Sequence, residues 1–428
     1  LLATPLYTVC HYLPISLSLS LYPHSTFLYF PHTMPSRLLD ASSHSLDFYS
    51  LKELPESYKW GPLDDPSGST GPVPAPVPII DLDEPNAREL IGHACKSWGV
   101  FQVTNHGVPK RLLDDMEGNS KSLFELPTRQ KLKAARLHDG VAGYGPARIS
   151  AFFPKRMWSE GFTILGSPLE HARQLWPNDY RKFCDIIEEY QKEMSILAGK
   201  LMWLILGSFG ASNQDVKRAS SQKRPGPFKG SNGAIQLNSY PACPDPGQAM
   251  GLAAHTDSTF LTVLHQSGGT SGLQVHHDRA GWVMVPPLPG GLVINVGDLL
   301  QILSNGQYRS VYHRAVVNRT RHRLSIAYLY GPGSRVRVRP ISKLVTTGHP
   351  PLYRPVTWSE YLDIKAKYFN KALSVIRLNN DKNNDNNNNE NNNDNNNKLN
   401  IMINGSIRVA TPKSIKFDSD AKILAAFA

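Results

Sequence analysis

The stretch GLAAHTDST, residues 251–259, decides how the rest of the chain is interpreted. It places His255 and Asp257 two residues apart, directly before the apolar run FLTVL at 260–264. Residues i and i+2 of a β-strand point to the same face, so these two side chains can aim at one point while Thr256 faces away. An imidazole and a carboxylate on one face form two thirds of the 2-His-1-carboxylate triad that binds non-haem Fe(II).

A third ligand and an anion-binding group follow on later strands. The run SVYHRAVV at 310–317 supplies His313, and the run RLSIAY at 323–328 carries Arg323 and Ser325 two residues apart. The planar guanidinium of Arg323 can bind a carboxylate through two hydrogen bonds, and the Ser325 hydroxyl can donate a third. Together these groups predict a metal site beside a carboxylate-binding site.

Other residues compete for the metal by type alone. A lone His-x-Asp pair is more often a surface pair or a structural hydrogen bond than a metal site. The conjunction of His-x-Asp, a histidine on a later strand and Arg-x-Ser favours His255, Asp257 and His313 as the catalytic metal ligands. The competing histidines are His106, His265, His276, His277 and His322. Asp298, which follows Gly297 in an expected tight turn, is the weaker carboxylate candidate.

The polar break Asn318-Arg319-Thr320 predicts a β-hairpin between the last two runs. A three-residue loop pairs Arg323 with Ala315, which places the guanidinium about 7 Å along the strand from His313. That offset suits a small dicarboxylate lying between a metal ion and Arg323. A four-residue loop places the two side chains on opposite faces, and the sequence does not fix the loop length.

These motifs resemble the signature of the plant Fe(II)/2-oxoglutarate-dependent dioxygenases. The run NSYPACPDP at 238–246 is similar to the Asn-x-Tyr-Pro-x-Cys-x-x-Pro motif found just upstream of the metal site in that superfamily. The runs at 236–241, 245–259 and 158–163 resemble most closely the gibberellin 3-oxidases, also called gibberellin 3-beta-dioxygenases. The likeness extends over residues 78–378.

The resemblance implies how the site is filled. Three positions on octahedral Fe(II) stay open, of which the 2-oxoglutarate co-substrate takes two and O2 takes the third. The far carboxylate of 2-oxoglutarate meets Arg323 and Ser325, Tyr240 donates a further hydrogen bond, and Asn238 joins this cofactor-binding set. Ascorbate keeps the iron reduced. The products are succinate, CO2 and a hydroxylated substrate.

The closest branch also implies a substrate. A gibberellin 3-oxidase hydroxylates C3 of an inactive gibberellin and yields a bioactive 3β-hydroxylated hormone. Such a diterpenoid carboxylic acid needs a cation outside the metal site. Arg148, Lys155 and Arg156, in an aromatic-rich segment at 140–166 that can wall an apolar pocket, are the candidates.

Other functions stay open at this stage. One is another plant 2-oxoglutarate dioxygenase, such as a gibberellin 20-oxidase, a gibberellin 2-oxidase or a flavonoid oxidase. A second is a catalytically silent jelly roll that binds a hormone. A third is a metal-storing or structural jelly roll, which has no use for Arg323. Regiochemistry is decided by pocket shape, which the sequence does not give.

The order of apolar patterns predicts the fold class. We expect an α+β fold with a double-stranded β-helix (jelly roll) core, a helical N-terminal cap and a long supporting helix at 180–206. Nine short β-rich runs separated by turn residues make the core. They are 234–240, 259–264, 272–275, 281–285, 291–296, 299–303, 309–317, 323–330 and 335–339.

Composition shifts divide the chain into six expected parts. Residues 1–33 lack an initiating Met and are interpreted as a leader or disordered segment, and the Asn-rich tail at 379–428 as disordered. Between them lie the cap domain with its first strands and spine helix at 34–210, a basic flexible loop at 211–232, the jelly-roll dioxygenase domain at 233–345 and a C-terminal helical segment at 346–378.

Charge and cysteine usage bound the partners. The net charge is +11, and the Lys and Arg residues between 217 and 229 form either a nucleic-acid patch or, as we favour, a solvated loop. The four scattered cysteines show no CxxC spacing, which indicates a reduced, intracellular protein. We expect a monomer in the cytoplasm, with the nucleus as a further location, that binds neither nucleic acid nor membrane.

Overall fold

The structure is a computed structural model that describes residues 47–48, 50–63, 76–137, 140–212, 214–215, 218, 232–267 and 269–378. The expected leader at 1–33, the Asn-rich tail at 379–428 and most of the basic loop lie outside the described residues. None of the helices in the described part of the chain is long and apolar enough to cross a membrane.

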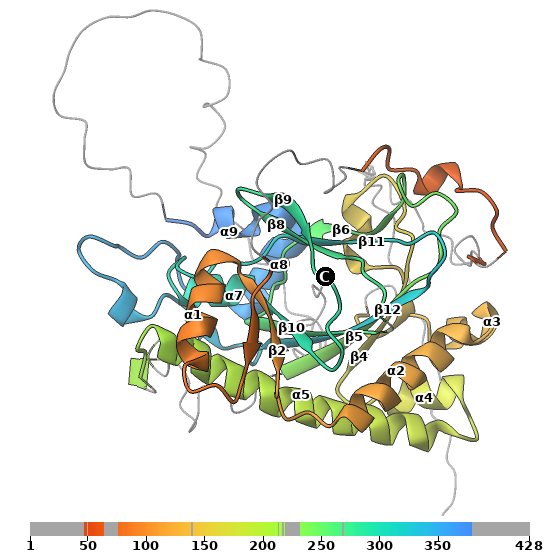
Figure 1. Cartoon of the computed structure of the whole chain (residues 1–428), viewed down its shortest axis with the longest axis horizontal. Helices are drawn as coiled ribbons and strands as arrows, with labels where there is room; N and C mark the ends of the chain where they lie inside the picture. The colour runs from red at the N-terminus through yellow and green to blue at the C-terminus, as the bar shows by residue number, and fades with distance from the viewer. Residues whose placement is uncertain are drawn as a thin grey trace, which may run out of the picture. The chain divides into compact units, whose positions relative to one another are not determined.

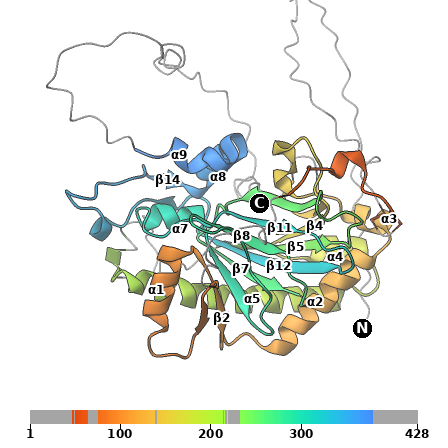
Figure 2. The same ribbon diagram turned by 45° about the horizontal axis from the view of Figure 1, so that its top comes forward.

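Two β-sheets form the core. The larger has eight strands in the order β1-β2-β10-β7-β12-β5-β4-β3, and the smaller has four in the order β6-β11-β8-β9. Figure 2 shows the smaller sheet lying over the larger one. The larger sheet holds β1 (Ile79–Asp81), β2 (Val100–Thr104), β3 (Gly143–Gly145), β4 (Glu160–Leu165), β5 (Asn232–Tyr240), β7 (Leu261–Gln266), β10 (Leu292–Val296) and β12 (Arg323–Gly331). The smaller holds β6 (Met250–His255), β8 (Leu273–His277), β9 (Gly281–Met284) and β11 (His313–Val316), while β13 (Arg337–Val338) pairs separately with β14 (Val356–Thr357).

Alternation along the strands divides the apolar side chains between two cores. On β7 and β10, Leu264 and Val293 join a cluster with Leu273 and Val275 of the smaller sheet. Their chain neighbours point the other way, as Val263 does, and join the core beneath the helices. Because successive strand residues face opposite sides, one strand can serve both cores.

Helices α1, α2 and α5 lie against the outer face of the larger sheet. The helices are α1 (Ala87–Ser97), α2 (Lys110–Glu125), α3 (Thr128–Lys131), α4 (Leu169–Leu175), α5 (Tyr180–Ser208), α7 (Asp298–Leu303), α8 (Trp358–Tyr368) and α9 (Ala372–Val375). Figure 1 shows α5 running along this face with α1 and α2 beside it. Its buried residues Ile187, Tyr190, Met194 and Leu197 recur every three or four positions, which is the spacing of one helix face. The predicted α+β class, jelly-roll core and supporting helix are confirmed.

One predicted strand was wrong, and three elements of the structure were not predicted. Residues 299–303 form the helix α7 instead of a strand. All four of its leucine and isoleucine side chains are buried, and a short, wholly apolar run cannot be assigned to helix or strand by periodicity alone. Strands β3 and β4 and the helix α4 were not predicted, and β4 lies inside the aromatic-rich segment at 140–166.

The predicted hairpin between His313 and Arg323 was also wrong. Strand β11 lies in the smaller sheet between β6 and β8, and β12 lies in the larger sheet between β5 and β7. Both edges of β11 are already paired, so β12 has no free edge of β11 to join. The connection at 317–322 therefore crosses from one sheet to the other, and Asn318 stabilises its turn by accepting from the backbone N–H groups of Thr320 and Arg321.

Candidate active site

Three buried side chains meet where β6 and β11 lie side by side. His255 ends β6 and His313 begins β11, and the two residues are direct partners in the antiparallel ladder. Their ring centroids are 4.3 Å apart. The Asp257 Oδ1 atom lies 3.5 Å from His255 Nε2 and 3.7 Å from His313 Nε2. The structure thus brings together the three residues that were predicted as ligands from the sequence.

Asp257 reaches this point from a loop and not from the strand we predicted. Strand β6 ends at His255, and Asp257 lies beyond it, on the way to β7. The ladder between β6 and β11 has no partner for β6 past His255, so the chain leaves the sheet there. The Thr262 hydroxyl on β7 donates to Asp257 Oδ2 at 2.6 Å and fixes the carboxylate instead.

Backbone carbonyls orient both imidazoles. Nδ1 of His255 lies 2.8 Å from the Ala253 carbonyl oxygen, and Nδ1 of His313 lies 3.1 Å from that of Val311. A carbonyl only accepts, so each Nδ1 carries a proton, and Nε2 is the ring nitrogen that is left to bind a metal. This is the tautomer that a metal-binding histidine needs, and such hydrogen bonds also hold the ring in place.

The protonation states suit a cation. Burial, followed by repulsion from His255, lowers the pKa of His313 to about 4, so this imidazole is neutral at pH 7. Burial acts to raise the pKa of Asp257, but His313, His255 and the Thr262 hydroxyl outweigh it and hold that pKa well below its usual value. Two imidazole nitrogens and one carboxylate are the donor set of a facial Fe(II) site.

The spacing of the donor atoms also fits an ion. Ligand atoms of the three residues lie within 4.8 Å of one another, and no other group of three or more His, Cys, Asp or Glu does so in the described part of the chain. Adjacent ligands on an octahedral ion at about 2.1 Å are about 3 Å apart. Separations of 3.5 and 3.7 Å therefore leave room for a metal ion to draw the three groups in.

A buried guanidinium faces the same space from the larger sheet. Arg323 is 3% exposed, and its Nη2 atom donates to Gln266 Oε1 at 3.0 Å. Its Nε and Nη1 atoms are buried without a hydrogen-bond partner among the described residues, and burial lowers its pKa. No ion pair to Arg323 is formed by the described residues. A buried charge without a counter-ion is unfavourable, so this position is suited to an anion that binds from outside.

Strand register places the other candidates around Arg323. Arg323 is paired with Tyr240 across β12 and β5, and Ser325 is paired with Asn238. The Arg323 guanidinium carbon lies 5.0 Å from the centre of the Tyr240 ring. The four side chains come from alternate positions of two adjacent strands and therefore share one face of the sheet.

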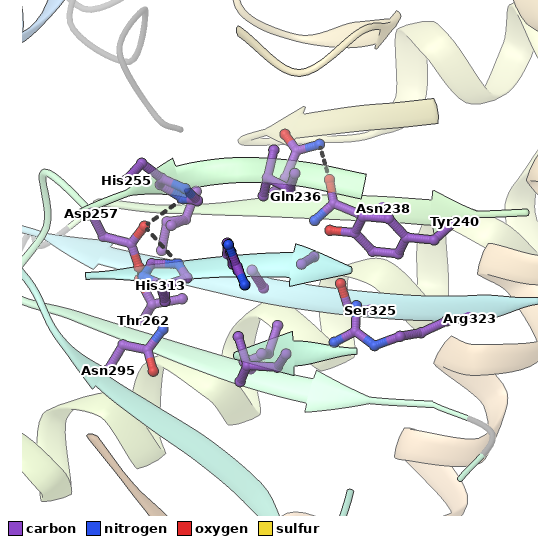
Figure 3. Close-up of a pocket in the computed structure, with 17 residues that line it drawn as sticks. Gln236, Asn238, Tyr240, His255, Asp257, Thr262, Asn295, His313, Arg323 and Ser325 are labelled. Atoms are coloured by element: carbon purple, nitrogen blue, oxygen red, sulfur yellow. Dashed lines mark hydrogen bonds and ion pairs between the residues drawn. The ribbon is translucent and has the colours of Figure 1, made fainter. Parts of the chain in front are cut away.

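The metal-ligand cluster and Arg323 line one cavity. Figure 3 shows His255, Asp257 and His313 grouped at one end, and Tyr240, Arg323 and Ser325 at the other. The metal ligands come from the smaller sheet and the loop after β6, whereas Tyr240, Arg323 and Ser325 come from the larger sheet. Arg323 therefore comes near the metal ligands across the core, and not along a hairpin as predicted. The remaining lining residues are Gln236, Asn238, Leu252, Thr262, Leu264, Leu273, Asn295, Arg314, Ala315, Ala327 and Leu329.

The competing histidines, and the basic residues predicted to bind the substrate carboxylate, do not line this cavity. His106 bonds the Gly290 carbonyl, His322 bonds Ser239, and neither lines the cavity. Asp298 likewise stays outside the cavity, within an ion pair to Lys365. Arg148, Lys155 and Arg156 are also absent from the cavity wall. Lys155 is paired with Glu56 at the surface, and Arg148 donates to the Gly140 carbonyl.

Sequence reasoning missed three polar residues of the cavity region. Thr262 bonds Asp257, Gln266 bonds Arg323, and the Asn295 Oδ1 atom is buried without a partner among the described residues. Gln266 stands between two other polar residues, but Thr262 and Asn295 each stand inside an apolar run, where a lone polar residue is costly unless it has a partner. That signal was present in the sequence and could have identified Thr262 and Asn295.

Comparison with known proteins supports the geometry. The profile of the 2OG-Fe(II) oxygenase superfamily matches residues 231–332, which contain the whole His-Asp-His cluster and Arg323. The profile of the N-terminal domain described as non-haem dioxygenase in morphine synthesis matches residues 77–181.

Full-length relatives narrow the assignment. The chain is 58% identical over 337 residues to gibberellin 3-beta-dioxygenase 1 of Pisum sativum, a match that covers 78% of this chain and 89% of that protein. It is 56% identical over 344 residues to gibberellin 3-beta-dioxygenase 1 of Arabidopsis thaliana, covering 79% and 95%. The chain belongs to the gibberellin 3-beta-dioxygenase family. It is thus a 2-oxoglutarate-dependent dioxygenase, of a superfamily that acts on small molecules.

Solved structures agree with the fold of this dioxygenase. JOX2, crystallised with 2OG, Fe and JA, is 31% identical with a TM-score of 0.62, and the match covers 73% of this chain and 89% of that one. The rice dioxygenase for auxin oxidation is 28% identical with a TM-score of 0.57, covering 71% and 100%. The buried donor set, and an Arg323 that forms no ion pair with any described residue, fit the Fe(II) and 2-oxoglutarate that the family uses.

Proposed function

We propose that this dioxygenase converts an inactive gibberellin into a bioactive one by hydroxylating C3 on the β face, at the expense of 2-oxoglutarate and O2. One observation carries the proposal: a single cavity joins a 2-His-1-carboxylate donor set to a buried guanidinium that lacks a counter-ion among the described residues. The chain that builds this cavity is 58% identical to a curated gibberellin 3-beta-dioxygenase.

His255, Asp257 and His313 would hold the iron through two Nε2 atoms and one carboxylate oxygen. Bound Fe(II) supplies the O2 activation that couples decarboxylation of 2-oxoglutarate to hydroxylation of the substrate, with ascorbate keeping the iron reduced. The overall reaction is balanced: substrate, 2-oxoglutarate and O2 give hydroxylated product, succinate and CO2. The protein's own contribution is to keep both imidazoles in one tautomer and the carboxylate ionised.

Arg323 would bind the far carboxylate of 2-oxoglutarate, with Ser325 and Tyr240 donating to the same group. The unpartnered Nε and Nη1 atoms are the donors that this carboxylate would satisfy. Asn238 is held by Gln236, whose Nε2 donates to Asn238 Oδ1 at 3.1 Å, and it closes the same side of the cavity. These residues orient the co-substrate so that its keto acid end points to the metal ligands.

The rest of the proposal concerns partners. A diterpenoid carboxylic acid would enter past the apolar lining residues, which keep water from the reacting carbon. Arg148, Lys155 and Arg156, the predicted partners of its carboxylate, lie outside the cavity wall and would meet it only where the substrate extends beyond the cavity. We further propose that the enzyme acts as a monomer in the cytoplasm, with the nucleus as a further location, and binds neither nucleic acid nor membrane. Its described cysteines Cys95, Cys184 and Cys243 are free and buried, as expected in a reducing compartment.

The test is a product assay. Purified protein is incubated with Fe(II), ascorbate, 2-oxoglutarate and a panel of gibberellins that carry or lack a 3β-hydroxyl, and the products are identified by mass spectrometry. We expect 3β-hydroxylated product and succinate in equal amounts from substrates that lack the group. Hydroxylation at C2 or oxidation at C20 would reassign the regiochemistry to a gibberellin 2- or 20-oxidase. Turnover of flavonoids alone would indicate a flavonoid oxidase, and tight hormone binding without any succinate would indicate a silent binding protein.

A further inference from the structure

One C-terminal segment contacts residues 254, 256 and 258, which alternate with the metal ligands His255 and Asp257. The segment runs from α8 into the short 3-10 helix Phe369–Lys371. The Trp358 Nε1 atom donates to the Ser258 carbonyl at 3.0 Å, and the Lys365 ammonium donates to the Thr256 hydroxyl at 2.6 Å. A third contact joins the Asn370 amide to the carbonyl of residue 254 at 3.2 Å.

These contacts alternate with the metal ligands. Residues 254, 256 and 258 receive the C-terminal segment, while His255 and Asp257 point into the cavity. The stretch is therefore held from the side opposite to the metal. Because Asp257 lies outside any strand, no β-ladder fixes it, and individual hydrogen bonds from neighbouring segments must do so.

A buried ion pair lies at the centre of this arrangement. Lys365 Nζ is 2.6 Å from Asp298 Oδ2, and their side chains are 7% and 0% exposed. The same carboxylate oxygen accepts from the Tyr361 hydroxyl at 2.7 Å and from the Thr256 hydroxyl at 3.2 Å. Asp298 also donates its backbone N–H to the Asp257 carbonyl at 2.8 Å. The pair thus reaches both the residue between the ligands and the backbone of one ligand.

We propose that Lys365 and Asp298 are positioning residues for the metal site, and that α8 acts through them to hold Thr256 and Asp257 in the geometry that the metal requires. The inference rests on the proposed function, since it assigns a role toward the Fe(II) that the dioxygenase uses. Buried ion pairs are weak stabilisers, because desolvation offsets their attraction, and a role in fixing one local arrangement explains this one better.

The test measures metal affinity without turnover. Mn(II) is titrated into metal-free protein, and free Mn(II) is followed by electron paramagnetic resonance. In Lys365→Met we expect the Mn(II) affinity to fall about 10- to 100-fold, as for groups that orient metal ligands. Lys367→Met is the matched control, since Lys367 lies on the same helix but is exposed. It should bind Mn(II) as the unaltered protein does.

Two further variants separate positioning from general loss of stability. Leu113→Ala removes a buried side chain of α2 that does not line the cavity, and should lower the melting temperature while keeping the Mn(II) affinity within about twofold. Thr256→Val keeps the ion pair but removes the hydroxyl that Lys365 and Asp298 share, and should still weaken Mn(II) binding severalfold. It also serves if Lys365→Met does not fold.

The outcomes separate this inference from the proposed function. If the unaltered protein fails to bind Mn(II), or fails to form succinate, the proposed function is wrong. If it does both and Lys365→Met or Thr256→Val binds Mn(II) as tightly as the Lys367→Met control, the positioning role is wrong. Weakened binding in Leu113→Ala to the same degree would also overturn it, because the effect would then reflect stability alone.

Discussion

Replacing Arg323 with alanine should raise the 2-oxoglutarate requirement far more than it lowers stability. The guanidinium is buried beside the cavity, and its Nε and Nη1 atoms have no hydrogen-bond partner in the described part of the chain. Truncating one side of a buried, hydrogen-bonded charge pair costs about 2–5 kcal/mol. Taking about 3 kcal/mol, at about 1.4 kcal/mol for each factor of ten, the KM for 2-oxoglutarate should rise roughly 100-fold or more.

The assay is succinate formation at increasing 2-oxoglutarate, with saturating gibberellin and Fe(II). Arg321→Ala is the control, since Arg321 is an exposed residue just before β12. A second readout is thermal unfolding with Mn(II) present. Added 2-oxoglutarate should raise the melting temperature of the unaltered protein but not of Arg323→Ala. Because the substitution removes a charge that has no buried counter-ion among the described residues, ligand-free stability should fall little. A KM within about threefold of the control value would refute the assignment of Arg323 to the co-substrate.

Three other predictions follow from the metal end of the cavity. Asp257→Ala should abolish both Mn(II) binding and succinate formation; retained turnover with bound metal would contradict the ligand assignment. Thr262→Val removes the 2.6 Å hydrogen bond to the Asp257 carboxylate and should weaken Mn(II) binding about tenfold while the fold is kept, as titration and circular dichroism would show. The third concerns pH in the metal-free protein. The pKa of His313 is about 4 in the folded protein, against an ordinary value of 6.5. Between these two pH values the unfolded chain binds a proton on this imidazole that the folded protein does not bind. The free energy of unfolding should therefore fall, by at most about 3 kcal/mol, as the pH drops from 6.5 towards 4. Urea unfolding at several pH values should show a shallower slope for His313→Gln, and an equal slope would show that His313 does not cause the loss.

The chemistry of the site could be predicted from the sequence more readily than its architecture. His255, His313 and Arg323 were selected because His-x-Asp, a later histidine and Arg-x-Ser occur together in successive apolar runs. The hairpin joining the last two was wrong, because strand partners depend on which edges other strands leave free. That information comes from β5, β6, β7 and β8 together and is not contained in the two runs or the break between them.

The C-terminal contacts show a second limit of the same kind. In the sequence Lys365 is one more lysine on an amphipathic helix, yet it is 6% exposed and paired with Asp298 at the start of α7. Asp298 was correctly set aside as a ligand, but its role behind the ligands could not be inferred, because a supporting partner has no motif of its own. Such pairs are recognisable only once the fold brings the two residues together.

The charge of Arg323 in a buried strand explains why the ligand-binding residues could be recognised from the sequence. Every residue of β12 is buried, so a strand of this kind should contain apolar side chains throughout. An arginine there raises the free energy of the ligand-free fold, and no carboxylate among the described residues offsets that cost. The two imidazoles and the carboxylate brought within 4.8 Å of one another likewise depart from the apolar pattern of the runs around them. Residues that stabilise the protein only when a ligand is bound depart from the pattern of their own strand, and that departure can be recognised in the amino-acid sequence itself.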